Sequence, residues 1–216
     1  MIRVGLTGNV GSGKSEVARL WRDAGIPVVD ADALAREVVA KGNPGLAEVV
    51  DTFGDSILTA EGTLDRAKLR GIVFADSAER ARLEAVVHPR IGVLRRRWVE
   101  DREAEGAPLI VCEIPLLFET GSEGDFDFVV LVHATEVERE RRLREGRGLT
   151  SGEARRIMAS QGDAEAKLAR ADYVLHNSGT RDELRSAALD LLDVLRTAAD
   201  TWTGVERAPG DGREAE

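Results

Sequence analysis

The chain has 216 residues, 43% of them hydrophobic, which is enough for one cored domain with an inserted subdomain. Its 39 acidic and 30 basic side chains give a formal net charge of −9, which argues against a broad, sequence-independent hold on nucleic acid. No signal segment stands at the start, and no apolar run approaches the roughly 18 residues of a membrane span. The single cysteine, Cys112, cannot form an internal disulfide, which favours a reducing compartment. We therefore expect a cytoplasmic protein. The sequence indicates no membrane association and no obligate protein partner.

The first predicted element is an apolar strand over residues 2–6, and residues 8–15 follow it with the sequence GNVGSGKS. This stretch fits the phosphate-binding loop pattern, in which four residues separate a first glycine from a Gly-Lys-Ser triplet. Its glycines let backbone N–H groups surround polyphosphate oxygens, and the following helix adds its N-terminal amides and dipole. A glycine-rich turn that serves only packing is the alternative. The loop residues expected to bind the nucleotide are Gly8, Gly11, Ser12, Gly13, Lys14 and Ser15.

Lys14 and Ser15 have separate roles in this pattern. The lysine reaches the β- and γ-phosphates as a point charge, and the serine hydroxyl ligates a magnesium ion that bridges them. The sequence therefore predicts a site for a nucleoside triphosphate with Mg²⁺. The residues that the helix beginning at Lys14 is expected to bury are Val17, Ala18, Leu20 and Trp21.

A second strand is predicted over residues 27–30, and two acids, Asp30 and Asp32, lie at its carboxyl end. In an open α/β sheet, ligands bind outside the carboxyl ends of the strands, so both acids are placed for magnesium or substrate. One of them is also expected to cap the helix that follows. We assign one role to each acid: Asp30 is partly structural, and Asp32 is the candidate functional acid.

Residues 41 to about 105 have a helical pattern that turns interrupt and no strand signal. Asp65 is expected to cap one helix. Asp76 or Ser77 is expected to start another that ends near His88-Pro89, because proline restricts the residue before it. The excursion is longer than a crossover between strands needs. It therefore predicts a helical domain that binds the second substrate, with extra packing helices as the alternative.

Three further strands are predicted over residues 109–114, 128–132 and 171–175. Helices separate every pair of strands, so the sheet should be parallel. Glu113 lies where phosphate-loop enzymes often keep an acid for magnesium or its water shell. The predicted fold class is therefore α/β, with a P-loop NTPase core on a five-stranded parallel sheet, a helical substrate-binding domain and a helical lid.

The predicted lid covers residues 136–170, where many arginines alternate with acids between glycine-rich joints. Capping-box patterns open its helices, with Thr135 before Glu138 and Thr150 before Glu153. A phosphoryl-transfer site must exclude water and neutralise charge, and arginines on a closing helical hairpin do both. The alternative is an exposed helix with surface salt bridges.

A third capping box, Thr180 with Glu183, predicts a final packing helix. The polar residues 204–216 after it are expected to be disordered. The predicted organisation is a nucleotide-binding core of residues 1–32, 106–135 and 171–203, a helical substrate-binding domain of residues 33–105, and a lid of residues 136–170.

The order of these motifs resembles the dephospho-coenzyme A kinase family from the first strand to Gly179. Besides the phosphate loop, the segments that carry the resemblance are Val29-Asp30-Ala31-Asp32, Gly62-Thr63-Leu64-Asp65-Arg66, His88-Pro89, Pro115-Leu116-Leu117-Phe118-Glu119, Gln161, and Ala171-Asp172-Tyr173-Val174 with Asn177. The resemblance implies transfer of the γ-phosphoryl group of ATP to the 3′-hydroxyl of dephospho-coenzyme A, with Mg²⁺, as the last step of coenzyme A synthesis.

The resemblance also implies roles for individual residues. Asp32 would orient or deprotonate the acceptor hydroxyl, Lys14 would stabilise charge on the transferred group, and Arg142 would do so from the lid. Asn177 would lie near the nucleotide base. The residues implied for the acceptor substrate are Asp32, Arg66, His88, Leu117 and Glu119.

Three positions depart from the family pattern. Glu16, counted with the nucleotide-binding residues, stands where a threonine is common, and its carboxylate is unwelcome beside phosphate unless it points away. Asn9 replaces a more usual glycine, which is tolerable because asparagine visits the left-handed region. Gly146 stands where a lid arginine belongs. Arg144 or Arg147 can substitute for it, and only Arg142 transfers cleanly from the family pattern, so the arginine that contacts the phosphates is expected among these three.

Two other functions remain open from the sequence. Another small-molecule kinase with the same core, such as a nucleoside monophosphate kinase, would share the phosphate loop. A non-catalytic nucleotide switch would share it too. However, the chain lacks a guanine-specific Asn-Lys-x-Asp segment, and the acids near the loop favour turnover.

Overall fold

The computed structural model of the chain describes residues 1–162 and 164–202, so the predicted tail lies outside the described residues. The chain divides into two compact units. Unit 1 contains Met1–Val28 and the described residues from Arg102 onward, and unit 2 contains Val29–Asp101. Within the described ranges, no helix has both the length and the apolarity that crossing a membrane requires.

The sheet has five strands in the order β2-β3-β1-β4-β5, so the predicted five-stranded parallel α/β fold is confirmed. All five residues of β3 are buried, as is typical of a parallel strand covered on both faces. The parallel register sets Leu6 beside Glu113 and His133 beside His176, so the carboxyl ends of neighbouring strands meet at one edge. The strands are β1 (Ile2–Thr7), β2 (Val28–Asp30), β3 (Leu109–Glu113), β4 (Phe128–His133) and β5 (Tyr173–His176).

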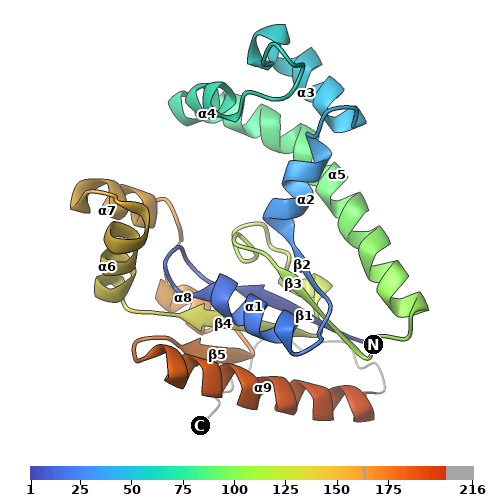
Figure 1. Cartoon of the computed structure of the whole chain (residues 1–216), viewed down its shortest axis with the longest axis vertical. Coiled ribbons are helices and arrows are strands. Elements are labelled where there is room, and N and C mark those ends of the chain that lie inside the picture. The colour runs from blue at the N-terminus through green and yellow to red at the C-terminus, as the bar shows by residue number, and fades with distance from the viewer. Residues whose placement is uncertain (163, 203–216) are drawn as a thin grey trace. The chain divides into compact units, whose positions relative to one another are not determined.

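Helices α1 (Lys14–Asp23) and α9 (Arg181–Thr201) pack together and share the main apolar core of unit 1 (Figure 1). The indole Nε1 of the buried Trp21 donates to the Ala188 carbonyl at 2.7 Å, which joins the two helices directly. The predicted buried face of α1 is confirmed. The buried residues of α9, at helical spacing, are Leu184, Ala188, Leu191, Leu192 and Leu195.

Unit 2 is helical, with an apolar core of its own around Val49 and Ile57. Asp65 caps α4, as predicted, because its side chain accepts from the Lys68 N–H at 3.0 Å. Its helices are α2 (Ala31–Val38), α3 (Pro44–Phe53), the short 3₁₀ helix η1 (Asp55–Ile57), α4 (Arg66–Ala75) and most of α5 (Ser77–Ala104).

The prediction that a helix ends at His88-Pro89 is wrong, because α5 continues through Pro89 to Ala104. Proline lacks an N–H and so deprives the carbonyl of Ala85, four residues earlier, of its helical partner. Both residues are exposed, so water can bond to that carbonyl. Beyond the proline, Ile91 and Leu94 pack into the core of unit 2. Tertiary packing therefore outweighs the local preference of the sequence.

Three of the remaining helices belong to the predicted lid, and threonine caps open two of them. Thr150 forms a complete capping box with Glu153, as Thr180 does for α9. Thr135 accepts from the Glu138 N–H at 3.3 Å, but the Glu138 carboxylate bonds to Arg141 at 2.9 Å, so half of the box forms. The elements are α6 (Glu136–Arg147), α7 (Ser151–Ala159), α8 (Ala164–Leu168) and, before β4, the 3₁₀ helix η2 (Glu123–Asp125).

Candidate active site

The phosphate-binding loop joins β1 to α1, and glycine is required for its shape. Gly11 has φ 79° and Gly13 has φ 98°, conformations that residues with a side chain rarely adopt. A Cβ at Gly8 would lie 2.5 Å from the carbonyl oxygen of Val132, and one at Gly13 would collide with the side-chain amide of Asn177. The backbone conformation and the close neighbours therefore both account for the glycine pattern.

Lys14 and Ser15 both bond to Glu113. The Lys14 ammonium forms an ion pair with Oε1 of Glu113, and the Ser15 hydroxyl donates to the same oxygen at 3.0 Å. The β1–β3 register brings Glu113 to the loop, because it pairs with Leu6 two residues before Gly8. Glu113 is 6% exposed, and a buried carboxylate is stable only when it is paired in this way. A cation, a hydroxyl and an acid thus meet at the start of α1.

These groups suit a magnesium ion. Mg²⁺ prefers oxygen ligands and is usually bound through one or two protein groups together with waters and substrate phosphates. Ser15 and Glu113 supply oxygen donors that already lie 3.0 Å apart. Among the described residues, no group of three or more His, Cys, Asp or Glu side chains could hold a metal ion. A magnesium ion at this place would therefore depend on phosphate oxygens for further ligands.

Glu16 points along α1 to Arg19. Its carboxylate accepts from Arg19 Nη2 at 2.6 Å and from Nε at 3.2 Å. This hydrogen bond is the main cause that holds the pKa of Glu16 below its ordinary value, and the charges of Arg181 and Arg185 add to it. The negative charge is thus balanced by arginines of α1 and α9, which reduces its repulsion of a nearby phosphate.

Two arginines of α6 bond to carbonyl oxygens of the phosphate loop. Arg142 donates to the Gly11 carbonyl at 3.2 Å. Arg139 is 3% exposed, and its Nε donates to the Val10 carbonyl at 3.0 Å. Burial lowers the pKa of the Arg139 guanidinium from its ordinary value. The other lid arginines that competed with Arg142 in the sequence are exposed: Arg144 and Arg147.

Asn177, predicted to lie near the base, is 7% exposed and bonds to the phosphate loop. Its Nδ2 donates to the Ser12 carbonyl at 2.7 Å. Arg142 Nη2 donates to the Asn177 carbonyl at 2.8 Å and to its Oδ1 at 3.2 Å. The loop after β5, the first lid helix and the phosphate loop are thereby joined.

The positions of Gln161 and Arg139 at this site were not predicted. Gln161 Oε1 accepts from the Val10 N–H at 2.7 Å and from Arg139 Nη2 at 3.3 Å. The only feature of the sequence that pointed to a role for Gln161 was its place in the family pattern. Arg139 is four residues before the buried Leu143, and this spacing puts both on one face of α6. That spacing was the available signal, but α6 carries other arginines that face solvent.

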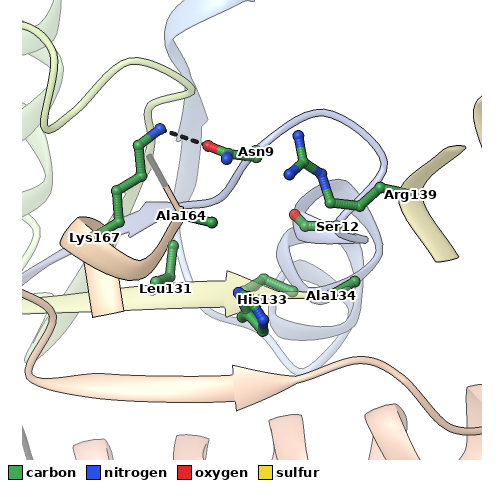
Figure 2. A pocket seen from close by; sticks show the side chains of 9 residues that line it. Asn9, Ser12, Leu131, His133, Ala134, Arg139, Ala164 and Lys167 are labelled. Atoms are coloured by element: carbon green, nitrogen blue, oxygen red, sulfur yellow. Dashed lines mark hydrogen bonds between the residues drawn. The ribbon is translucent and has the colours of Figure 1, made fainter. Parts of the chain in front are cut away.

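Glu119, predicted to bind the acceptor, pairs with a buried lysine. Lys167 is 4% exposed, and its Nζ bonds to Glu119 Oε1 at 2.6 Å. It also bonds to Asn9 Oδ1 at 2.5 Å, as Figure 2 shows. Burial raises the pKa of Glu119, but the hydrogen bond from Lys167 and further contacts outweigh it, so the net shift is downward. Leu117, in the same predicted set, is a fully buried core side chain.

The other predicted site residues lie in unit 2. Asp30 is the N-cap of α2, because its Oδ1 accepts from the Asp32 N–H at 2.8 Å, so its predicted structural role is confirmed. Asp32 is exposed in the first turn of that helix. Arg66 begins α4 and His88 lies within α5, and both are exposed. The functional roles of these last three residues stay predictions.

The sequence is similar to known dephospho-CoA kinases along most of its length. A sequence model of the dephospho-CoA kinase family matches residues 2–183. The dephospho-CoA kinase of Corynebacterium glutamicum is 44% identical over 192 residues, which cover 89% of this chain and 96% of the relative. That of Streptomyces avermitilis is also 44% identical, over 217 aligned residues that cover 99% and 100% of the two chains.

Solved structures agree with these relatives. The structure of TT1252 from Thermus thermophilus has a TM-score of 0.75 and 41% identity, with 90% of this chain and 97% of that chain covered. The dephospho-CoA kinase from Campylobacter jejuni has a TM-score of 0.69 at 23% identity, with 91% and 98% covered, which supports the fold. From the family match and these identities, the chain belongs to the dephospho-CoA kinase family.

Proposed function

We infer that this chain is an ATP-dependent kinase that transfers the γ-phosphoryl group of ATP to the 3′-hydroxyl of dephospho-coenzyme A, the final step of coenzyme A synthesis. The observation that carries the inference is the convergence of Lys14 and Ser15 on Glu113 at a glycine-dependent phosphate loop, in a chain of this family. Positioning and charge neutralisation account for nearly all of the catalysis in such a reaction.

Lys14 is the proposed cation for the transferred group. Its ammonium has three N–H donors, and the bond to Glu113 uses one of them. The remaining donors can bond to phosphate oxygens, on which negative charge is spread during transfer. Glu113 holds the amine at the start of α1, where the helix dipole also favours an anion. The ion pair thus orients Lys14 before the nucleotide arrives.

Magnesium is the proposed cofactor, with Ser15 and Glu113 as the residues that would hold it directly or through water. Bound there, the ion would neutralise part of the negative charge of the phosphates. The hydrogen bond between the Ser15 hydroxyl and Glu113 sets both oxygen donors in place.

Asp32 is the proposed acid that orients or deprotonates the acceptor hydroxyl. Its exposed position in the first turn of α2, next to an N-cap that fixes the backbone, supports this role. Arg66 and His88 are proposed to bind the acceptor, as exposed groups of the same unit. Leu117 is buried and Glu119 is paired with Lys167, so both are proposed to support the acceptor site by positioning neighbouring residues.

On the nucleotide side, Asn177 is proposed to lie near the base, and Arg142 is proposed to neutralise charge on the transferred group from the lid. Both residues bond to the phosphate loop and to each other, which supports these roles. The organisation into a core, a substrate-binding domain of residues 33–105 and a lid of residues 136–170 stays a proposal. Unit 2, Val29–Asp101, overlaps most of the proposed substrate-binding domain, which supports its separation from the core. We also propose a cytoplasmic location, because a single, buried, unpaired cysteine is typical of proteins in a reducing compartment.

The test is a product assay. The purified chain is incubated with Mg²⁺, ATP and dephospho-coenzyme A, and the 3′-phosphorylated product is sought by mass spectrometry. Parallel reactions contain a nucleoside monophosphate as acceptor, or EDTA in place of Mg²⁺. We expect product from dephospho-coenzyme A alone, and only with the metal. Absence of that product, or a faster reaction with the nucleoside monophosphate, would overturn the proposed function.

A further inference from the structure

A small cavity lies behind the phosphate loop, between the loop, the end of β4, and helices α6 and α8 (Figure 2). Its volume is about 10 Å³, which corresponds to a single water molecule. The polar side chains that line it are Asn9, Ser12, His133, Arg139 and Lys167.

The hydroxyl of Ser12 is a buried polar group at this cavity that lacks a hydrogen-bond partner. Ser12 is 1% exposed, and its Oγ has no hydrogen-bond partner among the described residues. The backbone of the same residue is fully bonded: its N–H donates to the Asn9 carbonyl at 3.0 Å, and its carbonyl accepts from Asn177. Buried polar groups in folded proteins are nearly always paired with protein or with ordered water. The side chain is therefore the unsatisfied part of an otherwise fixed residue.

Asn9 offers a second polar group at the cavity, and Lys167 determines its orientation. A lysine ammonium only donates, so the oxygen of the Asn9 amide must face Lys167, to which it bonds at 2.5 Å. The Nδ2 group is the other arm of the same amide, and within the described residues no side-chain or backbone acceptor bonds to it, so it can donate to a water molecule. Glu119 balances the charge of Lys167, which keeps this orientation stable.

The size of the cavity and the polar groups that line it favour water as the occupant. A cavity of this volume is too small for phosphate, and the neighbouring Arg139 and Lys167 are positively charged, which disfavours a metal cation. A water molecule both donates and accepts, so it can bond to a hydroxyl and to an amide N–H together. We propose that one internal water molecule occupies this cavity, bonds to Ser12 Oγ and Asn9 Nδ2, and forms a permanent part of the phosphate loop.

This water would give the loop one further contact. Arg139 and Arg142 bond to the carbonyls of residues 10–12, and Asn177 bonds to that of Ser12. The water would add a link between the side chains at positions 9 and 12. Because the inference concerns the folded loop alone, it does not depend on which acceptor the chain phosphorylates.

A crystal structure of the wild-type chain, at a resolution that shows ordered water, tests the occupant directly. We expect one well-ordered peak in the cavity within hydrogen-bond distance of Ser12 Oγ and Asn9 Nδ2. A second crystal soaked in bromide distinguishes water from a halide, since bromide gives an anomalous signal. A cavity without density, or one with an anomalous peak, overturns the proposal.

Two substitutions at Ser12 test the bonding in solution, through the melting temperature of the ligand-free protein. Ser12→Ala removes the hydroxyl that the water needs, so we expect a fall of about 2–4 °C. If the hydroxyl were unpaired in a dry cavity, its removal would leave the melting temperature unchanged or raise it.

Ser12→Thr keeps the hydroxyl and adds a methyl group. It should also lower the melting temperature, because the methyl group displaces the water, whereas in a dry cavity it would fill space and stabilise the fold. Ser178→Ala is the matched control, since Ser178 is exposed in the loop after β5, and it should melt like the wild type. Stability equal to or above that of the control for both Ser12 variants overturns the proposal.

Discussion

Gln161 and Val10 lie 151 positions apart, yet the Gln161 side-chain oxygen accepts a hydrogen bond from the Val10 N–H at 2.7 Å. The same oxygen accepts from Arg139 Nη2 at 3.3 Å, so one amide joins the segment after α7, the helix α6 and the phosphate loop. A movement of the lid segment would therefore act on the loop that holds the phosphates.

Gln161→Ala should weaken nucleotide binding. The substitution leaves the Val10 N–H and one arm of Arg139 without their partner, and a lost hydrogen bond of this kind corresponds to about a tenfold rise in the KM for ATP. Steady-state kinetics at varied ATP check this. Ser160→Ala is the control, since Ser160 is an exposed neighbour without a bond to the loop and its loss should leave the KM for ATP unchanged. A Gln161→Ala variant with the KM of the wild type would show that the contact does not shape the loop.

The parts of the fold that were predicted correctly depend on short-range patterns. The glycines of the phosphate loop, the buried face of α1 and the caps formed by Asp30 and Thr150 are all determined by residues within a few positions of each other. The prediction that a helix ends at Pro89 was wrong because long-range contacts decide there. The local preference of Pro89 is to end a helix, and the apolar contacts that carry α5 past it come from other helices of unit 2.

The residues of the candidate site also differ in whether a local pattern could identify them. Lys14 and Ser15 were identified from the loop pattern. The burial of Lys167 was not, because a lysine in a short polar helix is normally exposed. Its burial depends on Asn9, 158 residues earlier, and on Glu119, 48 residues earlier. No local pattern reports such partners.

Asp30 and Asp32 should have separable effects. Asp30→Ala removes the N-cap of α2 and should cost about 1 kcal/mol of stability with a small effect on turnover. Asp32→Ala should cost less stability than Asp30→Ala, because the backbone of Asp32 and not its carboxylate makes the cap bond. It should lower turnover on the order of a hundredfold, because its carboxylate is the proposed group that handles the acceptor proton. Thermal melts and kinase assays on both variants check this pair. Near-normal turnover in Asp32→Ala would remove Asp32 from the catalytic residues.

Lys14→Met should lower kcat on the order of a hundredfold or more, because it removes a cation that acts on the charge of the transferred group. Methionine keeps most of the side-chain volume, which limits the structural change. Arg22→Met removes a positive charge from an exposed position of the same helix and should leave turnover unchanged. Equal losses in the two variants would point to the charge of the helix as a whole and not to the ammonium of Lys14.

His133 should titrate below pH 6.5. Burial is the main cause that lowers its pKa, and the charge of His176, whose ring centroid lies 5.7 Å away, adds to it. Because the folded pKa is lower than the unfolded one, the neutral imidazole contributes stability above pH 6.5 that is lost as the pH falls. An NMR titration, assigned with His133→Asn, measures the pKa. In His176→Asn it should rise but stay below 6.5, and a wild-type value at or above 6.5 would contradict the burial argument.

Lys167 and Glu119 should be coupled energetically, and the coupling should depend on pH. Lys167→Met leaves the Glu119 carboxylate without its cation and should cost about 2 kcal/mol at pH 7. Glu119→Gln, combined with it in a double-mutant cycle, should give a coupling energy of about 1 kcal/mol, since the carboxylate is partly exposed to water.

The sign of the pH effect follows from the lowered pKa of Glu119. A carboxyl group that ionises more readily in the folded state than in the unfolded state stabilises the fold above its ordinary pKa of 4.5, and this contribution is lost as the pH falls below that value. Denaturant unfolding of the four proteins at pH 7 and at pH 4 measures the coupling energy under both conditions. It should be smaller at pH 4, because the carboxyl group is then mostly protonated in the unfolded state, so the ionised form contributes less to the stability of the fold. A coupling energy near zero at pH 7, or one that grows toward pH 4, would mean that Lys167 stabilises the fold through Asn9 and packing and not through its pair with Glu119.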